Sequence, residues 1–366
     1  MKTYAVRSRT TLLLLGLSLV PLGALADVGA AKTVASGLWN PRGINFAPNG
    51  ELYVAEAGRG GPGPCIPSPV PTNGNRCYGE TGGLAKISPN ESAPAQAFER
   101  VLTGLPSLVL GDGTVEGGPS DVAFLGSAPY VLLGLGGNPA VRQQLGGKAA
   151  LLGTLLQATP SGQYKRVADI AGQEAIDNPA GGAIDSNPYG LLVQPGRRIV
   201  ADAGANALFE NLANRQTSVF AVPTIPDGRD SVPTSVVEGP DGAVYVGLLT
   251  GGPFWAGTAP VLRIASDGSS IETYASGFTA IIDIAFDAGG ALYVLEAIRG
   301  VPPFPPGFGV GRLVRQCPGG ARSDLLTGLT FPGGVAIGPD GAAYLTNRGT
   351  SPSDGEVLRL PLTPCP

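Results

Sequence analysis

Short apolar runs alternate with turn-forming residues along the whole chain. One pattern occurs six times: a small or acidic residue, an apolar pair, a turn, and then a strand-like segment similar to Tyr-Val. Turns such as Asn-Gly at 49–50 and Asp-Gly at 241–242 and 340–341 separate the two halves, and such turns are typical of β-hairpins. The pattern therefore predicts six similar units. Their first halves are centred on Gly43, Asp121, Gly190, Ser235, Asp283 and Gly334.

Two further short strands follow the hairpin in most units. The predicted third strands are residues 83–88, 153–158, 217–222, 261–266, 312–317 and 356–361. The predicted fourth strands are residues 98–105, 164–170, 271–278 and 323–329. The signal for a fourth strand is weak in the third unit. Six units of four strands describe a β-propeller, in which each unit is one blade of a ring.

The sixth unit has no fourth strand after residues 356–361. Residues 31–38 match the fourth-strand copies, because Ala-Ser-Gly-Leu at 35–38 is similar to Ala-Ser-Gly-Phe at 275–278. We therefore expect the N-terminal strand to complete the last blade, which would leave no open sheet edge. The sequence predicts an all-β, six-bladed β-propeller as one domain over residues 27–366, and a repetitive β-sandwich is the alternative.

The first 26 residues have the pattern of a secretory signal peptide. Lys2, Arg7 and Arg9 precede an apolar run at 12–25, which glycine and proline interrupt. A membrane span would need about 20 apolar residues. We expect cleavage before Asp27, no membrane span in the mature chain, and a secreted or periplasmic location. An uncleaved anchor is the alternative.

Composition restricts the function more than the fold. The chain has 57 Gly and 35 Pro among 366 residues, and the predicted turns and loop insertions explain this high content. Signal-peptide cleavage would remove three of the 24 basic residues and none of the 28 acidic ones, which leaves a net charge of −7. Nucleic acid is therefore not an expected partner. The chain has no histidine, which excludes Ser-His-Asp and Cys-His nucleophilic sites and His-ligated metals.

The four cysteines form an even set in a chain that we expect to be exported, which favours two disulfides. Cys65 and Cys77 lie in one Gly/Pro-rich insertion and would close a small loop there. Cys317 and Cys365 follow the third strands of adjacent units, so both should emerge on the same face of the ring. A bridge between them would fasten the C-terminal tail.

Long insertions gather on one face of the predicted ring, which we call the loop-rich face. In a propeller the second-to-third and fourth-to-first connections share a face. Binding residues concentrate on loops that a rigid scaffold holds, so we expect this face to be functional. The insertions assigned to it are 57–82, 106–120, 134–152, 171–187, 203–216, 249–260 and 297–311.

The last residue of each predicted second strand should lie at the mouth of the central channel. Four of these residues, Glu56, Asp202, Glu296 and Asn347, carry oxygen ligands that could hold Ca²⁺. Asp121 and Asp283 begin first strands on the same face and could join them as ligand-binding residues. Two alternatives are that each acid accepts hydrogen bonds from a loop of its own blade, or that the carboxylates are catalytic.

The loop-rich face also carries aromatic and acidic residues. Aromatic platforms beside acids suit a sugar or an extended aromatic ligand. In the alternative, Pro-rich loops such as 301–309 bury their own Phe side chains for rigidity. The aromatic residues are Trp39, Phe254, Trp255, Phe304 and Phe308, and the acids are Asp112, Glu116, Asp177 and Asp185.

The stretch GLWNPRGINFAPNGELYVAEAGRGGPGPC at 37–65, followed by CYGETGGLAKIS at 77–88, resembles the ScyD/ScyE family of exported proteins. This family is related to NHL-type and gluconolactonase-like six-bladed propellers. Over the rest of the chain the resemblance is mainly in blade pattern, including the NHL-like IVADAGANAL at 199–208. The resemblance implies no proven reaction. Fold relatives include Ca²⁺-dependent lactonases with a Glu, Asn and Asp metal set, which Glu56, Asp202 and Asn347 match in type.

The sequence thus predicts an exported propeller that binds a small molecule or a protein through its loop-rich face, with no proven catalysis. The alternative function is a Ca²⁺-dependent hydrolase or lactonase that uses the carboxylates at the channel mouth.

Overall fold

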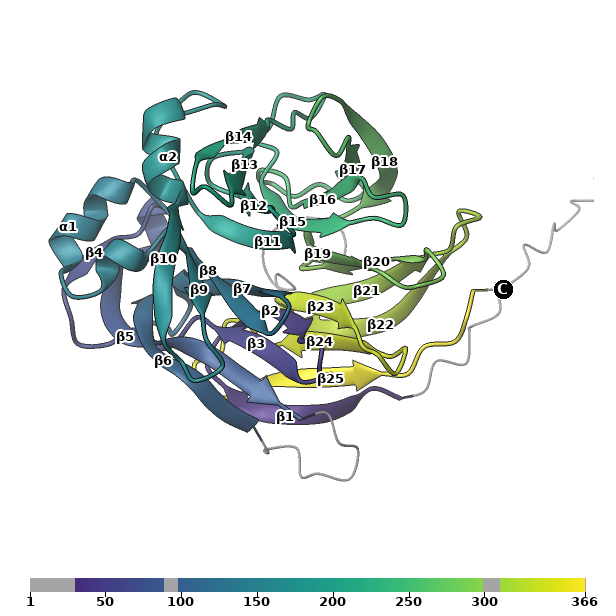
Figure 1. Ribbon diagram of the computed structural model, residues 1–366, viewed down its shortest axis with the longest axis horizontal. Coiled ribbons are helices and arrows are strands. Elements are labelled where there is room, and N and C mark those ends of the chain that lie inside the picture. The colour runs from purple at the N-terminus through teal and green to yellow at the C-terminus, as the bar shows by residue number, and fades with distance from the viewer. Residues whose placement is uncertain (1–29, 89–97, 299–309, 366) are drawn as a thin grey trace, which may run out of the picture.

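Antiparallel β-sheets arranged around a central axis make up the protein (Figure 1). The computed structural model describes residues 30–88, 98–298 and 310–365. The chain is all-β apart from short helices in the insertions, and the arrangement is that of a β-propeller. In these described ranges, no helix is long and apolar enough to cross a membrane. The predicted signal peptide at 1–26 lies outside the described residues.

Four separate sheets have four strands each. The first contains β11 (Pro188–Gln194), β12 (Arg197–Asp202), β13 (Ala207–Leu212) and β14 (Thr217–Ala221). The second contains β15 (Pro233–Glu238), β16 (Val244–Leu248), β17 (Ala259–Ile264) and β18 (Ile271–Phe278). The third contains β19 (Ile281–Phe286), β20 (Leu292–Glu296), β21 (Val310–Gln316) and β22 (Arg322–Thr330). The fourth contains β23 (Gly334–Ile337), β24 (Ala343–Asn347), β25 (Gly355–Leu360) and β1 (Lys32–Leu38).

The strands predicted for the first two units form one nine-stranded sheet instead of two blades. Four separate blades are therefore found where six were predicted. The long strands β5 (Asn75–Ile87) and β6 (Phe98–Leu110) connect the two predicted units. They pair with each other, and β6 also pairs with β7 (Val115–Leu125), where Val109 lies opposite Val115. The strands of this sheet are β2 (Pro41–Phe46), β3 (Leu52–Glu56), β4 (Cys65–Pro67), β5 (Asn75–Ile87), β6 (Phe98–Leu110), β7 (Val115–Leu125), β8 (Ala128–Gly134), β9 (Thr154–Ala158) and β10 (Tyr164–Asp169).

The first strands β2, β7, β11, β15, β19 and β23 surround the axis in chain order. Small residues let them approach closely: a Cβ atom added to Gly43 would lie 2.1 Å from Asp121 Oδ1, and one added to Gly190 would lie 2.9 Å from Ser235 Cα. Between the last strand and the first, a Cβ on Gly334 would lie 3.0 Å from Gly43 Cα. The ring of first strands is therefore closed.

The hydrophobic core fills the spaces between neighbouring sheets. Leu52 and Val54 of β3 pack against Tyr344 of β24, and Tyr130 of β8 packs in the same cluster as Phe209 of β13. Alternate residues of a strand face opposite sides of its sheet, and both sides are covered here. This is why the second strands are apolar at nearly every position.

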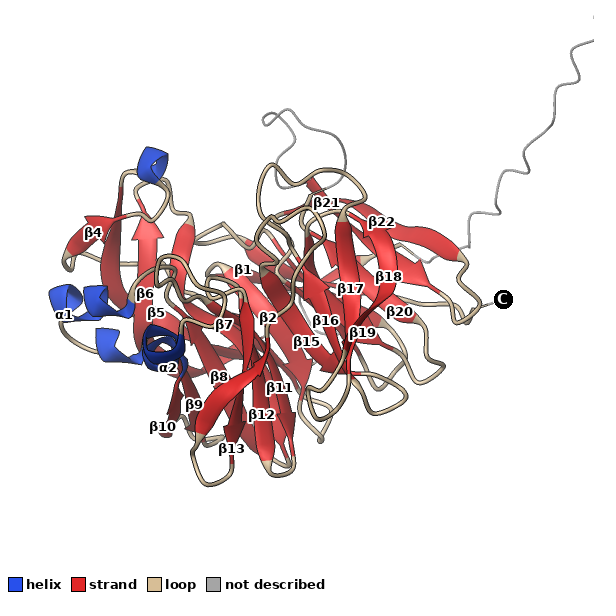
Figure 2. Cartoon of the chain, turned by 90° about the horizontal axis from the view of Figure 1, so that it is seen from above, coloured by secondary structure: helices blue, strands red, loops and turns tan. Residues whose placement is uncertain are grey.

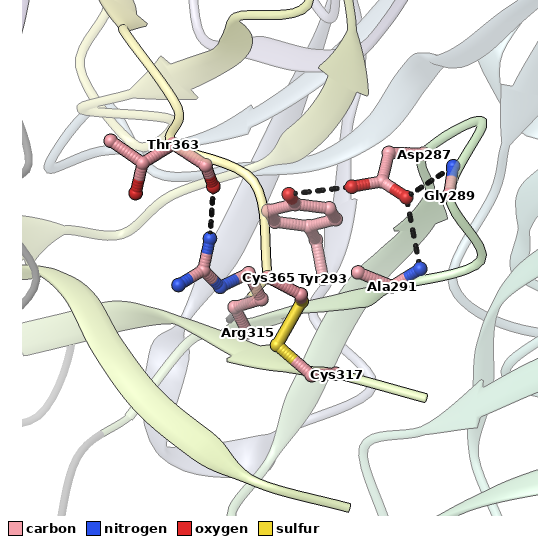
Figure 3. The surroundings of a disulfide bond; sticks show 8 residues. All are labelled: Asp287, Gly289, Ala291, Tyr293, Arg315, Cys317, Thr363 and Cys365. Carbon is pink, nitrogen blue, oxygen red and sulfur yellow. Dashed lines mark hydrogen bonds between the residues drawn. A yellow bond between two sulfur atoms is a disulfide. The ribbon is translucent and has the colours of Figure 1, made fainter. Parts of the chain in front are cut away.

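The N-terminal strand completes the last sheet, as predicted. β1 pairs antiparallel with β25, from Lys32 opposite Arg359 to Leu38 opposite Gly355. Both predicted disulfides are also present, Cys65–Cys77 between β4 and β5 and Cys317–Cys365 beyond β21 and β25. The second bridge holds the C-terminal tail, whose Thr363 carbonyl also accepts a hydrogen bond from Arg315 (Figure 3).

The insertions contain more regular structure than the sequence indicated. Short helices occur at η1 (Pro71–Asn73), η2 (Pro139–Val141), α1 (Arg142–Leu145), η3 (Ala149–Leu151) and α2 (Ile170–Asp177). They lie with β4 at one side of the molecule (Figure 2). Predicted loops at 57–82 and 106–120 contain strand, because β5 and β6 pair with each other and so satisfy their backbone groups. The loop predicted at 203–216 contains β13, which makes residues 217–221 a fourth strand and not a third.

Candidate functional site

Glu56 ends β3 at the channel mouth, and its side chain forms an ion pair within its own sheet. Arg100 of β6 donates to both carboxylate oxygens, at 2.8 and 2.9 Å. The backbone N–H of Trp39 donates to Oε1 at 2.8 Å. Glu56 is fully buried, whereas Arg100 remains partly exposed. The carboxylate therefore joins the outer strand β6 to the loop that precedes β2.

Glu296 ends β20 and repeats this arrangement with another arginine. Arg312, directly opposite in β21, donates at 2.6 and 3.1 Å. The backbone N–H of Thr279, just before β19, donates at 3.0 Å. Burial, the ion pair and the contact with the preceding loop are the same as at Glu56.

Asp202 and Asn347 occupy the same position in two other sheets but have no arginine partner. Asp202 accepts hydrogen bonds from the Ser186 hydroxyl and the Asn187 backbone N–H, both at 2.6 Å, and from two backbone N–H groups that follow it. Burial raises its pKa to about 6. Asn347 accepts from the Thr330 N–H at 2.8 Å and donates to Glu356 at 2.9 Å.

The four side chains at the ends of the second strands thus each bind the segment that precedes the first strand of their own sheet. In the described part of the chain, no group of three or more Asp, Glu, Cys or His side chains is placed to hold a metal ion. The structure does not assemble Glu56, Asp202 and Glu296 into the predicted Ca²⁺ ring, because each carboxylate is directed to local partners. Ca²⁺ binding by this protein stays a prediction.

Asp121 of β7 and Asp283 of β19 lie deeper, in the channel itself. Both line a cavity of about 220 Å³ together with apolar residues of the first strands. Asp121 accepts from the N–H groups of Val122 and Leu191, each at 2.8 Å. Each carboxylate is therefore held by backbone N–H groups, including one from a neighbouring first strand.

Asp283 has a similar set of partners. It accepts from the Ile284 and Val335 N–H groups and the Ser235 hydroxyl, all at 2.8 Å. Burial raises its pKa to about 6. Burial, followed by repulsion from Asp283, raises the pKa of Asp121 well above its ordinary value. The two predicted residues thus line one cavity and lie close enough for their charges to repel each other. The four predicted residues at the ends of the second strands do not line that cavity.

A third buried acid, Glu174 of α2, was not singled out by the sequence. Its side chain lies on the buried face of the helix with Ile170 and Ala171, and Oε2 has no hydrogen-bond partner among the described residues. Burial and then the charges of Asp202 and Asp185 raise its pKa to about 7. The helical spacing of Glu174 from Ile170 is the signal that would have placed it inside.

The two tryptophans of the loop-rich face have different surroundings. The guanidinium carbons of Arg59 and Arg100 lie 3.9 and 3.6 Å from the ring centroid of Trp39, and this side chain is only partly exposed. Trp255 is 50% exposed, and Arg229 lies 4.8 Å from its centroid. Of the two tryptophans, Trp255 therefore offers more of its ring to a ligand. Phe304 and Phe308 lie outside the described residues.

Three solved structures are similar to this chain at low sequence identity. A nidogen/laminin complex is 14% identical over 74% of this chain and 84% of that chain, with a TM-score of 0.49. A streptogramin B lyase is 11% identical over 91% and 98%, with a TM-score of 0.46. An auxiliary nutrient binding protein from Bacteroides thetaiotaomicron is 9% identical over 89% and 75%, with a TM-score of 0.50.

At these identities the comparisons show no function, and the assignment as a β-propeller rests on the arrangement of the protein's own sheets. The sequence matches no protein-family profile and no curated protein. None of these comparisons names the ScyD/ScyE family.

Proposed function

We propose that the protein is a ligand- or protein-binding scaffold that acts through its loop-rich face. We count the propeller as six-bladed, with the nine-stranded sheet as two joined blades, because six first strands surround the channel. The asymmetry of the two faces carries the proposal. The opposite face, which we call the turn face, has hairpin turns such as 49–50, 289–290 and 340–341.

The insertions of the loop-rich face are held in place by specific contacts. The N–H of Arg59 donates to the Thr81 hydroxyl at 2.8 Å, and the N–H of Gly60 donates to the Ser107 hydroxyl at 3.1 Å. Arg142 of α1 forms an ion pair with Asp169, the N-terminal cap of α2, at 2.8 Å. A surface fixed in this way loses little conformational entropy when a ligand binds.

Mapping the binding surface tests this proposal. A thermal-shift screen with sugars, aromatic compounds and peptides would identify a ligand, and hydrogen exchange with and without that ligand would locate it. We expect protection in segments 57–82, 134–152, 171–187 or 249–258. Protection confined to turns 289–290 and 340–341 would contradict the proposal.

Ca²⁺-dependent hydrolysis is the alternative, and calcium addition separates the two. Because the acids at the channel mouth already have local partners, we expect the melting temperature to be the same in Ca²⁺ and in EDTA. An increase with Ca²⁺ that Glu56→Gln abolishes would instead favour the metal-dependent enzyme.

We also propose that the chain is exported and belongs to the ScyD/ScyE family. Two disulfides persist best in an oxidising compartment, which supports export. The residues at 37–65 support the family assignment. N-terminal sequencing of the mature protein should begin at Asp27, and retention of the first 26 residues would contradict cleavage.

A further inference from the structure

Trp255 lies on a platform made by two neighbouring loops of the loop-rich face. The loop at 225–232 precedes β15, and the loop at 249–258 joins β16 to β17. Backbone hydrogen bonds join them: the N–H of Thr250 donates to Ser231 at 3.2 Å, and the N–H of Gly251 donates to Asp230 at 2.8 Å. The two loops therefore form one continuous surface.

Arg229 fixes the ring of Trp255 from behind. Its guanidinium donates to Asp227 at 2.6 and 2.9 Å, to the Gly251 carbonyl at 3.0 Å and to the Thr258 hydroxyl at 3.1 Å. The side chain of Arg229 is only 13% exposed. The Thr258 hydroxyl also donates to the Trp255 carbonyl at 2.8 Å. An arginine held at so many points keeps the indole in place without a ligand.

The exposed part of the indole is an apolar surface with a polar border. Its chain neighbours Pro253 and Ala256 are also exposed, and Phe254 is partly exposed. The border includes the carboxylates of Asp227 and Asp230, both exposed. An indole face beside carboxylates can contact both an apolar side and a polar edge of one ligand.

A pyranose ring has the complementary shape and chemistry. One side of it presents C–H groups, whose partial positive charge is attracted to the negative face of an aromatic ring. Its edge carries hydroxyls, which can donate to carboxylates and accept from N–H groups.

We propose that the open face of Trp255 stacks on a pyranose ring, so that the ligand of the loop-rich face is a carbohydrate. This inference rests on the proposed binding function and specifies its ligand class. Soluble oligosaccharides and insoluble polysaccharides share the required ring.

Calorimetric titration of the full mature chain with neutral gluco-oligosaccharides and chito-oligosaccharides tests the proposal. Sedimentation with cellulose or chitin tests the insoluble source. Trp255→Ala should weaken binding about tenfold or more, whereas Trp255→Phe should keep part of it. Ile271→Ala is the matched control, because it shortens an exposed apolar side chain of the same sheet, outside the insertions of the loop-rich face, and should leave affinity unchanged.

Fluorescence gives an independent readout. The chain has two tryptophans, and saturable quenching by a sugar that stacks on Trp255 should disappear in Trp255→Phe, in which only Trp39 remains. Sugar binding that is unchanged in Trp255→Ala would overturn the inference.

Failure of this inference can be told apart from failure of the proposed function. If none of these sugars binds but a peptide or aromatic compound protects 249–258 from exchange, the carbohydrate inference is wrong and the binding function stands. If a ligand protects only the turn face, both are wrong.

Discussion

Two pairs of carboxylates in this propeller differ in their hydrogen-bond donors. Glu56 and Glu296 each have a bidentate guanidinium partner and a backbone N–H. Asp121 and Asp283 have backbone N–H groups and one hydroxyl but no cation. The difference teaches that acids on the first and second strands of one propeller are held in different ways. The donor to each carboxylate depends on which side chain the neighbouring strands supply.

The largest expected effect comes from breaking an arginine-paired carboxylate. Glu56→Gln leaves Arg100 without its counter-charge beside Trp39, and we expect the free energy of unfolding to fall by about 3 kcal/mol. Denaturant titration of the wild type and the variant measures this difference in the free energy of unfolding. Glu51→Gln is the control in the same hairpin, because its ion pair with Lys86 is more exposed and should contribute less than about 1 kcal/mol. Equal losses in the two variants would contradict the distinction.

Asp121 and Asp283, which line the channel cavity, should make the free energy of unfolding depend on pH. The folded-state pKa of Asp283, about 6, lies above the ordinary value of 3.8. The stability that protonated Asp283 contributes is therefore fully present below about pH 4 and is lost as the pH rises through 6. The free energy of unfolding changes by about 2–3 kcal/mol over this range. We expect the free energy of unfolding to fall from pH 5 to pH 8, and Asp283→Asn to reduce that fall.

Ser235→Ala makes the complementary test. The Ser235 hydroxyl stabilises the charged form of Asp283, so its removal should raise the pKa of Asp283 further and make stability fall more between pH 5 and pH 8. Urea unfolding of wild type, Asp283→Asn and Ser235→Ala at several pH values measures all three slopes. If both variants change the slope in the same direction, Asp283 does not control it.

Glu174 should make a similar pH-dependent contribution. Its pKa of about 7 means that the stability it contributes in the protonated form is lost as the pH rises through 7. Glu174→Gln mimics that form, and we expect a gain of about 2–3 kcal/mol in the free energy of unfolding at pH 8 and little change at pH 5. Asp177→Asn, on the exposed side of α2, is the control. A loss of stability at pH 8 would contradict the assignment.

The sequence predicted the strands well because their signals are local. The hairpin turns and the apolar second strands follow directly from neighbouring residues, and so does the match between 35–38 and 275–278. Cys317 and Cys365 could be paired because both follow third strands. The nine-stranded sheet was missed because the pairing of β5 with β6 joins two segments whose glycines and prolines indicate turns when each is considered alone.

The site was harder to predict because partners depend on register. Glu296 was recognised, but Arg312 became its partner only once β20 and β21 were aligned residue by residue. Arg100 lies in an outer strand, two strands away from β3, and no local pattern connects it to Glu56. Trp39 and Trp255 were equivalent aromatic candidates in the sequence. In the structure two arginines lie close to the ring of Trp39, whereas Trp255 is half exposed beside Arg229.

The pairing of β1 with β25 also affects the order in which the strands can pair during synthesis. A ribosome produces β1 first and β25 last, and the two are separated by more than 300 residues, as in the hydrogen bond from Thr33 to Glu356. Such distant contacts form slowly, because the chain between them must be arranged first. β1 must therefore wait for β25, and a nascent chain carries this strand unpaired until β25 has been synthesised.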